Sequence, residues 1–586
     1  MAQTVKIGGK KSGAWLARYA LEQLPVGFTF GIPGVHNTEL YDELNKTQKI
    51  EPILVTHEGG ASFIADAISR TGNGQIGVLV IVPAAGATHA MSGIGEAYLD
   101  GIPMLVLTGG TRTDVEFGFQ LHELDQSKLM AAVTKGTWKI NSHAEVVPTI
   151  FEAYKLAVSG KPGPVFIEIP VNIQLFQGDV DSVPVFEAPV GRQVSPDSSI
   201  TEAAKLLSQA RKPGIFVGWG AIDVSAEIAD IAEMLGAPVS TTLQGLSAFN
   251  ARHPLHAGFG FSPAAVPAAQ NAFQGCDVML AVGTHFGEIP TGSYGCTVPE
   301  NLIHVDIDPK SINRNYKARI GIEGDSKVIV PKLRDAVHAL KLDNSARRQV
   351  VAAQIAKDKK AYREEWAAHT NERVNPSFLL QELRRQLRDD AITVVDDGNH
   401  TFLAAELFEV LGPRTFISPT DFNCMGYCVP AAIGAKLVNP DKQVIGIVGD
   451  GAFLMTGLEI LTASTNNAGV PYFVFHDGEL SQISQGQEIP YNRKTATIVG
   501  NIRIKGIADA TGAHYIEINN NDQIASGIRE ALERSAKGQP VVVDVRIDYS
   551  KRTRFTQGVV KTVLKRFPLG DKVRFVGRAV MRKVTG

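Results

Sequence analysis

The stretch Val444–Phe453, which reads VIGIVGDGAF, decides how this chain folds. Its first five residues are apolar and predict a buried strand. Gly449, Asp450 and Gly451 then predict a tight turn that leads into a helix beginning near Met455. At such a turn a phosphate can approach the backbone N–H groups of the helix start, and Asp450 is placed to hold a divalent cation against it. Glycine turns after strands are common, so this motif needs support from elsewhere in the chain.

A second predicted strand, Tyr472–Phe475, supplies that support. It is followed by His476, Asp477, Gly478 and Glu479. A strand-helix-strand unit brings Asp477 beside Asp450 at the ends of neighbouring strands. Two carboxylates in that position suit a magnesium ion that bridges a diphosphate, with backbone oxygens and water completing the coordination. The alternative is that the two aspartates are unrelated loop residues.

The rest of the chain repeats the alternation of strands and helices, which predicts an α/β fold with three doubly wound parallel-sheet domains. We place these domains at residues 1–185, 195–342 and 370–586. The predicted strands are 26–30, 52–55, 76–82, 103–108 and 165–169, then 214–217, 239–242, 278–282 and 302–307, and finally 392–395, 443–448, 472–475 and 541–545. Residues 177–199 read as a linker, and the charged stretch 343–375 reads as a solvated helix and connector.

Length and composition indicate a large globular protein. The chain has 586 residues, of which 44% are hydrophobic and 20% charged, and its formal net charge is −2. Such a balance gives no electrostatic reason to expect nucleic acid or membrane as the main partner. The exception is the basic stretch 551–586, where Asp571 is the single acidic residue. We interpret that stretch as a solvated tail.

The cysteines and the apolar runs bear on the compartment. Four cysteines are too few and too irregularly spaced for a disulfide framework or a zinc site, and buried thiols are expected at Cys424 and Cys428. No signal peptide and no membrane-length apolar run is visible. A reducing cytoplasm is therefore the expected location.

Glu58 is the most unusual carboxylate in the first third of the chain. It lies between the apolar strand at 52–55 and a helix of small and apolar residues that starts at Gly59. A carboxylate at such a seam suits proton transfer. The alternative is an ordinary acidic residue at a helix N-terminus, which the helix dipole favours.

Several motifs together resemble the thiamine diphosphate-dependent enzymes of the acetohydroxyacid (acetolactate) synthase, pyruvate oxidase and 2-keto acid decarboxylase group. They occur in that family's order over nearly all of the chain: FGIPGVHNTELYDEL (30–44), THEGGASFIADAISR (56–70), HELDQ (122–126), HVDIDP (304–309), CMGYCVPAAIGAKL (424–437) and GDGAFLMTGLEILTA (449–463). The resemblance implies that the three domains are pyrimidine-binding, central and diphosphate-binding, and that thiamine diphosphate and Mg²⁺ are the cofactors.

The resemblance also assigns roles to residues. Glu58 matches the acid/base that contacts the cofactor aminopyrimidine, and Met425 matches the apolar wedge beneath the bent cofactor. Asp450, Asp477 and the carbonyl of Glu479 match the metal ligands. The remaining implied cofactor contacts are Asn399, His400, Asn423, Gly449, Gly451 and Ala452. This chain has His476 and Asp477 where the family usually has two asparagines, so a cofactor-free relative is an alternative.

Substrate-side positions distinguish members of the family. Val35 and His36 follow the first strand and are expected to point toward the substrate, with His36 as a proton relay or, equally, a helix-capping or buried histidine. His122 stands where the synthases have glutamine and is a second candidate proton donor. Gln482 and Gly486, around Ile483, stand where biosynthetic synthases carry methionine and tryptophan. We therefore expect a wider, more polar pocket.

The predicted function is a thiamine diphosphate- and Mg²⁺-dependent carboligase or carbon–carbon lyase acting on a 2-keto acid, acetolactate synthase-like. Alternatives are a simple decarboxylase, another lyase, a flavin-linked oxidase and an inactive binding homologue. FAD is possible, but an empty central domain is favoured because the flavin-binding arginine pattern is missing at residues 283–288. The resemblance implies a homodimer or homotetramer with the cofactor between two chains, and it makes the basic tail a candidate lid.

Overall fold

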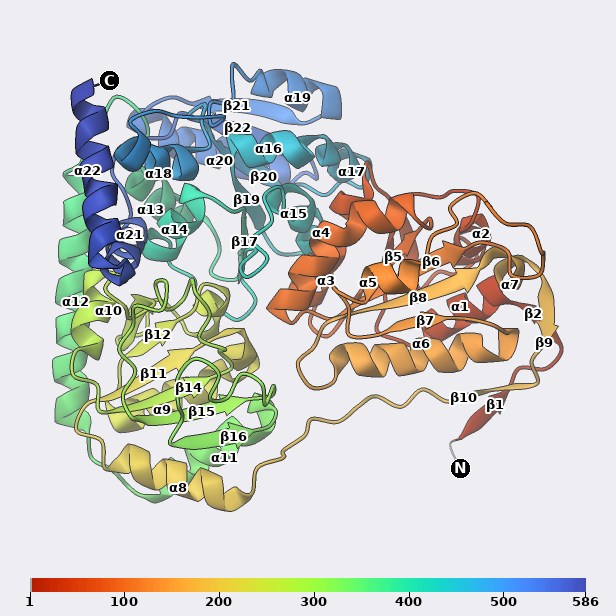
Figure 1. Cartoon of the computed structure of the whole chain (residues 1–586), viewed down its shortest axis with the longest axis horizontal. Coiled ribbons are helices and arrows are strands. Elements are labelled where there is room, and N and C mark those ends of the chain that lie inside the picture. The colour runs from red at the N-terminus through yellow and green to blue at the C-terminus, as the bar shows by residue number, and fades with distance from the viewer. Residues whose placement is uncertain (1–2, 586) are drawn as a thin grey trace.

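The computed structural model describes residues 3–585, and these form three α/β units, each built on a six-stranded parallel sheet (Figure 1). In Figure 1 the N-terminal unit lies to the right, the central unit at the lower left and the C-terminal unit at the upper left. The predicted fold class is confirmed. All pairings within the three large sheets are parallel, as helical crossovers between successive strands require.

The N-terminal sheet has the strand order β4-β3-β5-β6-β8-β7. Its strands are β3 (Phe28–Gly31), β4 (Glu51–Leu54), β5 (Gly77–Ile81), β6 (Met104–Gly110), β7 (Thr137–Lys139) and β8 (Pro164–Pro170). The main covering helices are α1 (Gly13–Glu22), α2 (Thr38–Leu44), α3 (Glu58–Thr71), α4 (Ala85–Asp100) and α6 (His143–Val158). Strands β5, β6 and β8 are buried throughout, because helices cover both faces of the sheet.

The predicted linker begins later than expected. Residues 177–184 form β9 (Gln177–Asp179) and β10 (Ser182–Pro184), which pair antiparallel with β2 (Lys10–Ser12) and β1 (Thr4–Lys6). Backbone pairing with the N-terminal segment fixes this polar stretch despite its turn-like composition. The extended connection between the first two units follows β10 and reaches α8 (Asp197–Ser208) (Figure 1).

The central sheet has the order β13-β12-β11-β14-β15-β16. Its strands are β11 (Pro213–Val217), β12 (Val239–Thr241), β13 (His256–Phe259), β14 (Val278–Val282), β15 (Asn301–Asp306) and β16 (Ile320–Glu323), with helices α9 (Ser225–Leu235), α10 (Pro267–Phe273) and α11 (Ser326–Ala339) around them.

The connector α12 (Ser345–Ala367) is less solvated than its charge pattern predicted. It runs along the left edge of Figure 1 and spans the central and C-terminal units. Ile355, Tyr362 and Trp366 are buried, and Trp366 is 0% exposed. The helix packs against α10 on one side and against α13 (Pro376–Gln386) on the other. It is therefore part of the seam between two units rather than a free spacer.

The C-terminal sheet has the order β18-β17-β19-β20-β22-β21. Its strands are β17 (Ile392–Val395), β18 (Phe416–Ile417), β19 (Val444–Gly449), β20 (Pro471–Phe475), β21 (His514–Ile518) and β22 (Val541–Val545). Its helices include α14 (Asn399–Leu407), α15 (Cys428–Val438), α16 (Asp450–Thr456), α17 (Ile460–Thr465), α18 (Ser481–Tyr491), α19 (Ile504–Thr511), α20 (Ile524–Ser535), α21 (Arg554–Arg566) and α22 (Leu569–Thr585). Strand β19 pairs directly with β20, as the sequence predicted.

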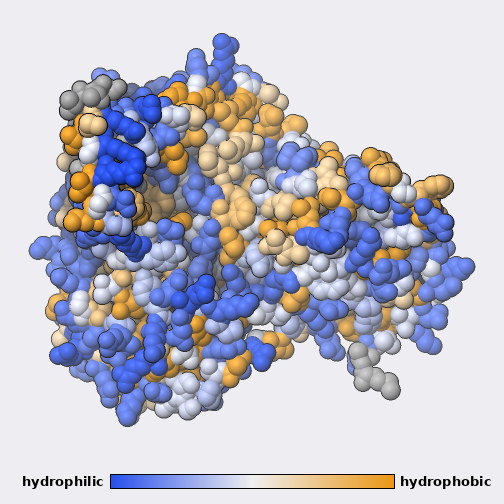
Figure 2. All heavy atoms as spheres, in the orientation of Figure 1, coloured by the Kyte–Doolittle hydropathy of each residue, from blue (hydrophilic) through white to orange (hydrophobic). Residues whose placement is uncertain are grey.

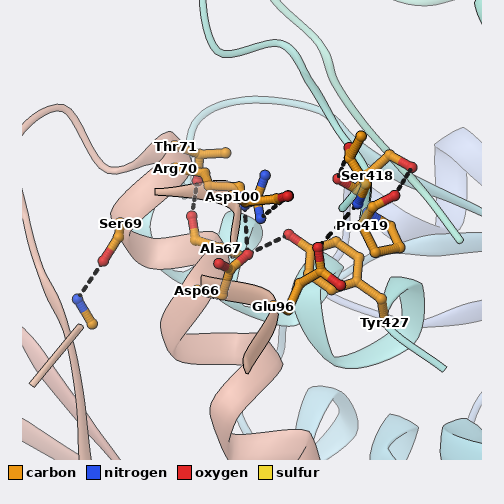
Figure 3. A network of polar contacts seen from close by, with 12 residues as sticks. Asp66, Ala67, Ser69, Arg70, Thr71, Glu96, Asp100, Ser418, Pro419 and Tyr427 are labelled. Atoms are coloured by element: carbon orange, nitrogen blue, oxygen red, sulfur yellow. Dashed lines mark hydrogen bonds and ion pairs between the residues drawn. The ribbon is translucent and has the colours of Figure 1, made fainter. Parts of the chain in front are cut away.

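A buried polar network joins the N-terminal and C-terminal units of the chain (Figure 3). Arg70 on α3 is 1% exposed, and its guanidinium bonds Asp66 at 2.6 Å and Asp100 at 2.8 Å. The Tyr427 hydroxyl, just before α15, donates to Asp66 at 2.6 Å. Helix α15 lies so close against α3 that a Cβ at Gly434 would overlap the backbone of Ile64. Removing one member of such a network would leave an uncompensated buried charge.

The described helices include no candidate for a membrane span. None of those within residues 3–585 combines the length and the apolar character that a membrane span requires.

Candidate functional site

The C-terminal unit holds a cavity of about 180 Å³ at the carboxyl ends of β17, β19 and β20. Helix α16 begins at Asp450, directly after β19, and not near Met455 as predicted. The strand passes into the helix with no intervening loop, so the first backbone N–H groups of α16 lie at the strand end. A Cβ at Gly451 would overlap Leu480 Cδ2, so a larger residue there would require the Leu480 side chain to move.

Two carboxylates meet in this cavity. Asp450 Oδ2 accepts from the backbone N–H groups of Asp477 at 3.2 Å and Gly478 at 2.7 Å, and Asp477 accepts from the Ser481 hydroxyl. Burial raises the pKa of Asp450, and burial together with the charge of Asp450 raises the pKa of Asp477 to about 6. Such a pair is stabilised by a cation between the two groups, so the donor set fits a divalent metal.

Unpaired polar atoms surround the same space. His400 is 3% exposed, and its Nε2 has no hydrogen-bond partner among the described residues; nor do the Tyr549 hydroxyl and Gln482 Oε1. Burial lowers the pKa of His400 to about 3, so its imidazole is neutral at pH 7. Buried polar groups are almost always paired in folded proteins. The residues that carry these atoms line the cavity, and together with the two carboxylates this polar lining fits a diphosphate cofactor with its metal.

Most of the predicted cofactor residues come together here. The cavity is lined by Asn399, His400, Asn423, Met425, Gly449, Asp450, Gly451, Ala452, Asp477, Glu479, Gln482 and Ile483. Gly486 lies one turn further along α18, outside the lining. The Glu479 carboxylate is engaged elsewhere, with Lys494 at 2.7 Å and the Ser484 hydroxyl at 2.6 Å.

The sequence did not identify the further lining residues Asp397, Gly398, Phe475, Leu480, Ser481 and Tyr549. Asp397 lies two residues before Asn399, a predicted cofactor contact, and this short spacing could have pointed to it. Burial raises its pKa to about 6. Tyr549 follows the last strand and carries no motif that could have identified it.

Glu58 lies in the N-terminal unit and does not line this cavity. It opens α3, is 6% exposed, and its Oε2 lies 3.0 Å from His89 Nδ1. His57 caps the same helix, since its Nδ1 accepts from the Gly59 N–H at 3.0 Å. His57, Glu58 and His89 each have one side-chain nitrogen or oxygen that could bind a metal ion, and these three atoms lie within 4.8 Å of one another. Neither histidine was singled out by sequence.

His36 and His122 contact each other in the N-terminal unit. Their Nδ1 atoms are 3.2 Å apart, and His36 is 7% exposed. One of the two nitrogens must donate and the other accept, so the contact requires at least one neutral ring. Burial and the neighbouring His122 lower the pKa of His36. Val35, in contrast, is 72% exposed.

A cavity of about 390 Å³ lies between the N-terminal and central units, at the carboxyl ends of β11 and β14, where the order of the central strands reverses. Gly220, Gly283 and Trp219 line it. Its arginine, Arg414, is already committed to Asp223 at 2.8 Å and to the carbonyl of Arg70 at 2.9 Å. Among the described residues, this lining therefore offers no free arginine for a flavin diphosphate.

Comparisons with known proteins agree with this geometry. The thiamine pyrophosphate enzyme N-terminal binding domain matches residues 11–129, the central domain matches residues 200–333, and the C-terminal binding domain matches residues 396–545. The chain is 30% identical to the acetolactate synthase large subunit of Corynebacterium glutamicum over 551 residues, which cover 91% of this chain and 86% of that protein.

Two further relatives are similar over comparable lengths. Acetolactate synthase isozyme 2 large subunit of Escherichia coli is 29% identical over 92% of this chain and 96% of its own length. The probable acetolactate synthase large subunit of Methanocaldococcus jannaschii is 31% identical over 90% of each. With all three domains matched in order, this chain belongs to the thiamine pyrophosphate-dependent enzyme family.

Proposed function

We propose that this protein is a thiamine diphosphate- and Mg²⁺-dependent carboligase or carbon–carbon lyase that acts on a 2-keto acid, in the manner of an acetolactate synthase. The observation that carries the proposal is the cavity at the ends of β17, β19 and β20, which is lined by two carboxylates and by residues with unpaired buried polar atoms. The likeness to acetolactate synthases supports the carboligase reading.

Thiamine diphosphate, when bound, supplies a C2 carbanion and an electron sink for decarboxylation of a 2-keto acid. Asp450, Asp477 and the carbonyl of Glu479 would hold Mg²⁺. The N–H groups at the start of α16, with Asn399 and His400, would bind the diphosphate. Because His400 is neutral, it contributes a directed hydrogen bond and no charge. Met425 and Asn423 would contact the rest of the cofactor.

Glu58 would hold and return the proton at the aminopyrimidine, and we infer that it does so in the cavity of a second chain. Two observations support this. Glu58 is absent from its own chain's cavity lining, and apolar side chains near the start of α16 are exposed: Leu454 (46%), Met455 (61%), Leu458 (62%) and Leu461 (48%). Figure 2 shows apolar side chains gathered over the region where α16 and α17 lie in Figure 1. An exposed apolar patch of this kind suits a homodimer or homotetramer.

The His36–His122 contact favours a second candidate, a simple 2-keto acid decarboxylase. A histidine pair can deliver a proton to an intermediate, whereas a carboligase must exclude protons until its acceptor arrives. Both candidates share the cofactor, the metal site and Glu58.

One experiment separates these candidates. The purified protein, with thiamine diphosphate and Mg²⁺, is incubated with a series of 2-keto acids, with and without a second carbonyl compound, while carbon dioxide and products are measured. A carboligase gives a coupled hydroxyketone product, and a decarboxylase gives the free aldehyde. Absence of carbon dioxide from every substrate, although the cofactor binds, would overturn both.

A further inference from the structure

A second enclosed space lies at the other end of α14 from the diphosphate cavity. Helix α14 begins at Asn399 in the candidate active site and ends at Leu407, which lines a cavity of about 320 Å³. This space sits at the seam of three parts: the edge strand β13 of the central sheet, the connector α12, and helices α13 and α14 of the C-terminal unit. None of its lining residues belongs to the site described above.

The walls of this seam cavity combine apolar surface with an excess of positive charge. The apolar part comes from Leu246, Val266, Leu407, Phe408 and Val410. The charged lining residues are the cations Arg252, Lys359, Arg363, Arg384 and Arg385 and the anions Asp358, Glu406 and Glu409. An apolar pocket with a few convergent charges is the usual form of a small-molecule site.

Three of the five cations already have acidic partners. Arg252 and Arg363 share Glu409, at 3.1 and 3.3 Å, and Arg385 pairs with Glu382 at 2.5 Å. Glu406 accepts instead from the Tyr362 hydroxyl at 2.5 Å and from the backbone N–H groups of residues 554 and 555. Asp358 accepts from the side-chain amides of Asn271 and Gln354, both at 2.9 Å. Each acidic side chain of the seam cavity therefore has a hydrogen-bond or ion-pair partner.

Lys359 and Arg384 form no salt bridge within the described part of the chain. Lys359 Nζ reaches only the Ala251 carbonyl and His256 Nδ1, both at 3.1 Å. His256 is buried, which keeps its pKa well below the usual range and its ring neutral. Burial also lowers the pKa of Lys359 to about 8.

Arg384 is 94% buried, with 6% of its surface exposed. One of its terminal nitrogens donates to the carbonyls of Leu387 and Arg388 at the end of α13, while its Nε has no hydrogen-bond partner among the described residues. Asp389, Glu409 and Asp390 act on Arg384 from beyond salt-bridge distance. A carboxylate in direct contact would lower the cost of burying this cation further. The alternative is that Arg384 serves only to cap α13.

From these two unpaired cations and the apolar walls around them, we propose that the seam cavity binds a small organic carboxylate with an apolar body. The carboxylate would lie between Lys359 and Arg384, and the apolar body would lie against Leu407 and Phe408. The inference does not depend on the proposed function, because no residue of the candidate active site takes part.

The reactivity of the Lys359 amine can show whether the seam cavity is occupied, and hexanoate is the probe carboxylate. Full-length protein is acetylated at neutral pH and the rate of modification at each lysine is followed by mass spectrometry. A carboxylate beside Lys359 raises its pKa by about one unit, which lowers the neutral amine fraction and the labelling rate about tenfold. Lys360, whose side chain is 76% exposed on the same helix, is the internal control and should not change.

Variants and other probes complete the test. Arg384→Met should abolish protection of Lys359 by hexanoate, whereas Arg385→Met, at a cation that is already paired, should preserve it. Hexan-1-ol and inorganic phosphate should not protect. The proposal is wrong if hexanoate leaves the wild-type Lys359 rate unchanged, if Arg384→Met retains protection, or if hexanol or phosphate protects equally well. The wild-type measurements decide the matter even where a variant fails to fold.

Discussion

The two halves of the candidate active site are built differently. The diphosphate half is enclosed, with Asp450, Asp477 and His400 lining one cavity of a single chain. The N-terminal half has no such enclosure: Glu58 meets His89 beside exposed side chains, and it does not line the cavity of its own chain. This difference is what the proposed shared site predicts: the residues of one chain would hold the diphosphate, and activation of the cofactor would need Glu58 from a second chain.

The largest expected effect separates activation from binding. Glu58→Gln should slow exchange of the cofactor C2 proton by about 10²- to 10⁴-fold, the usual size of a lost general acid/base. Affinity for thiamine diphosphate and Mg²⁺ should stay near that of wild type, because the amide leaves the enclosed half unchanged. Exchange followed by NMR in deuterated buffer, with cofactor affinity measured in parallel, checks both. Unchanged exchange would make Glu58 an ordinary helix N-terminal residue.

The next prediction tests how much the buried network around Arg70, which connects the N-terminal and C-terminal units, contributes to stability. Arg70→Met should lower the free energy of unfolding by about 3–5 kcal/mol, because Asp66 and Asp100 would be left as buried charges without a partner. Urea unfolding measures the loss. Lys505→Met is the matched control: its partner Asp509 forms an exposed pair on α19, for which less than about 1 kcal/mol is expected. Equal losses in the two variants would refute the special role of the network.

A smaller effect is expected within the enclosed half. Asp450→Asn should weaken Mg²⁺-dependent binding of thiamine diphosphate by about 10- to 100-fold. It should leave the His36–His122 region untouched. Titration of the cofactor into the apoprotein, with and without Mg²⁺, measures the change. Asp509→Asn, on the surface of the same unit, should bind as wild type does, and an equal loss there would point to general damage.

The smallest effect concerns pH and falls on the open half. Because the pKa of His36 is lowered in the folded protein, the unfolded chain binds more protons as pH falls. The stability that His36 contributes is therefore present above about pH 6.5, its unfolded pKa, and lost progressively below it. The protection of the backbone amides at 111–125, corrected for the intrinsic pH dependence of amide exchange, should fall over that range in wild type, and His36→Asn should remove this fall. If the protection of this loop does not change with pH, the protonation of His36 does not control its stability.

Much of this architecture was readable from the sequence. Apolar runs such as Val444–Val448 and Val541–Val545 predicted the interior strands, because strands buried on both faces are apolar throughout. In the three large sheets, the strands that the sequence did not reveal are β7, β13, β16, β18 and β21, and all of them lie at sheet edges. Edge strands are short or half-covered, so their residues carry no continuous apolar signal.

The candidate site divides in the same way. Residues near the glycine turn could be placed together because consecutive parallel strands end at one edge of a sheet. The contact between His36 and His122, the pairing of Glu58 with His89 and the position of Tyr549 could not, since each depends on packing between segments far apart in the chain. The start of α16 was misplaced because only the backbone shows that helix follows strand without a loop.

The buried network around Arg70 has a genetic consequence. It fixes the N-terminal and C-terminal units of one chain against each other, so a chain does not close its own Glu58 onto its own Asp450 by a simple hinge. If each site takes its halves from two chains, two alleles that are each impaired alone, one carrying Glu58→Gln and the other Asp450→Asn, complement each other in the same cell. Mixed oligomers then contain one site with both intact residues and one with neither.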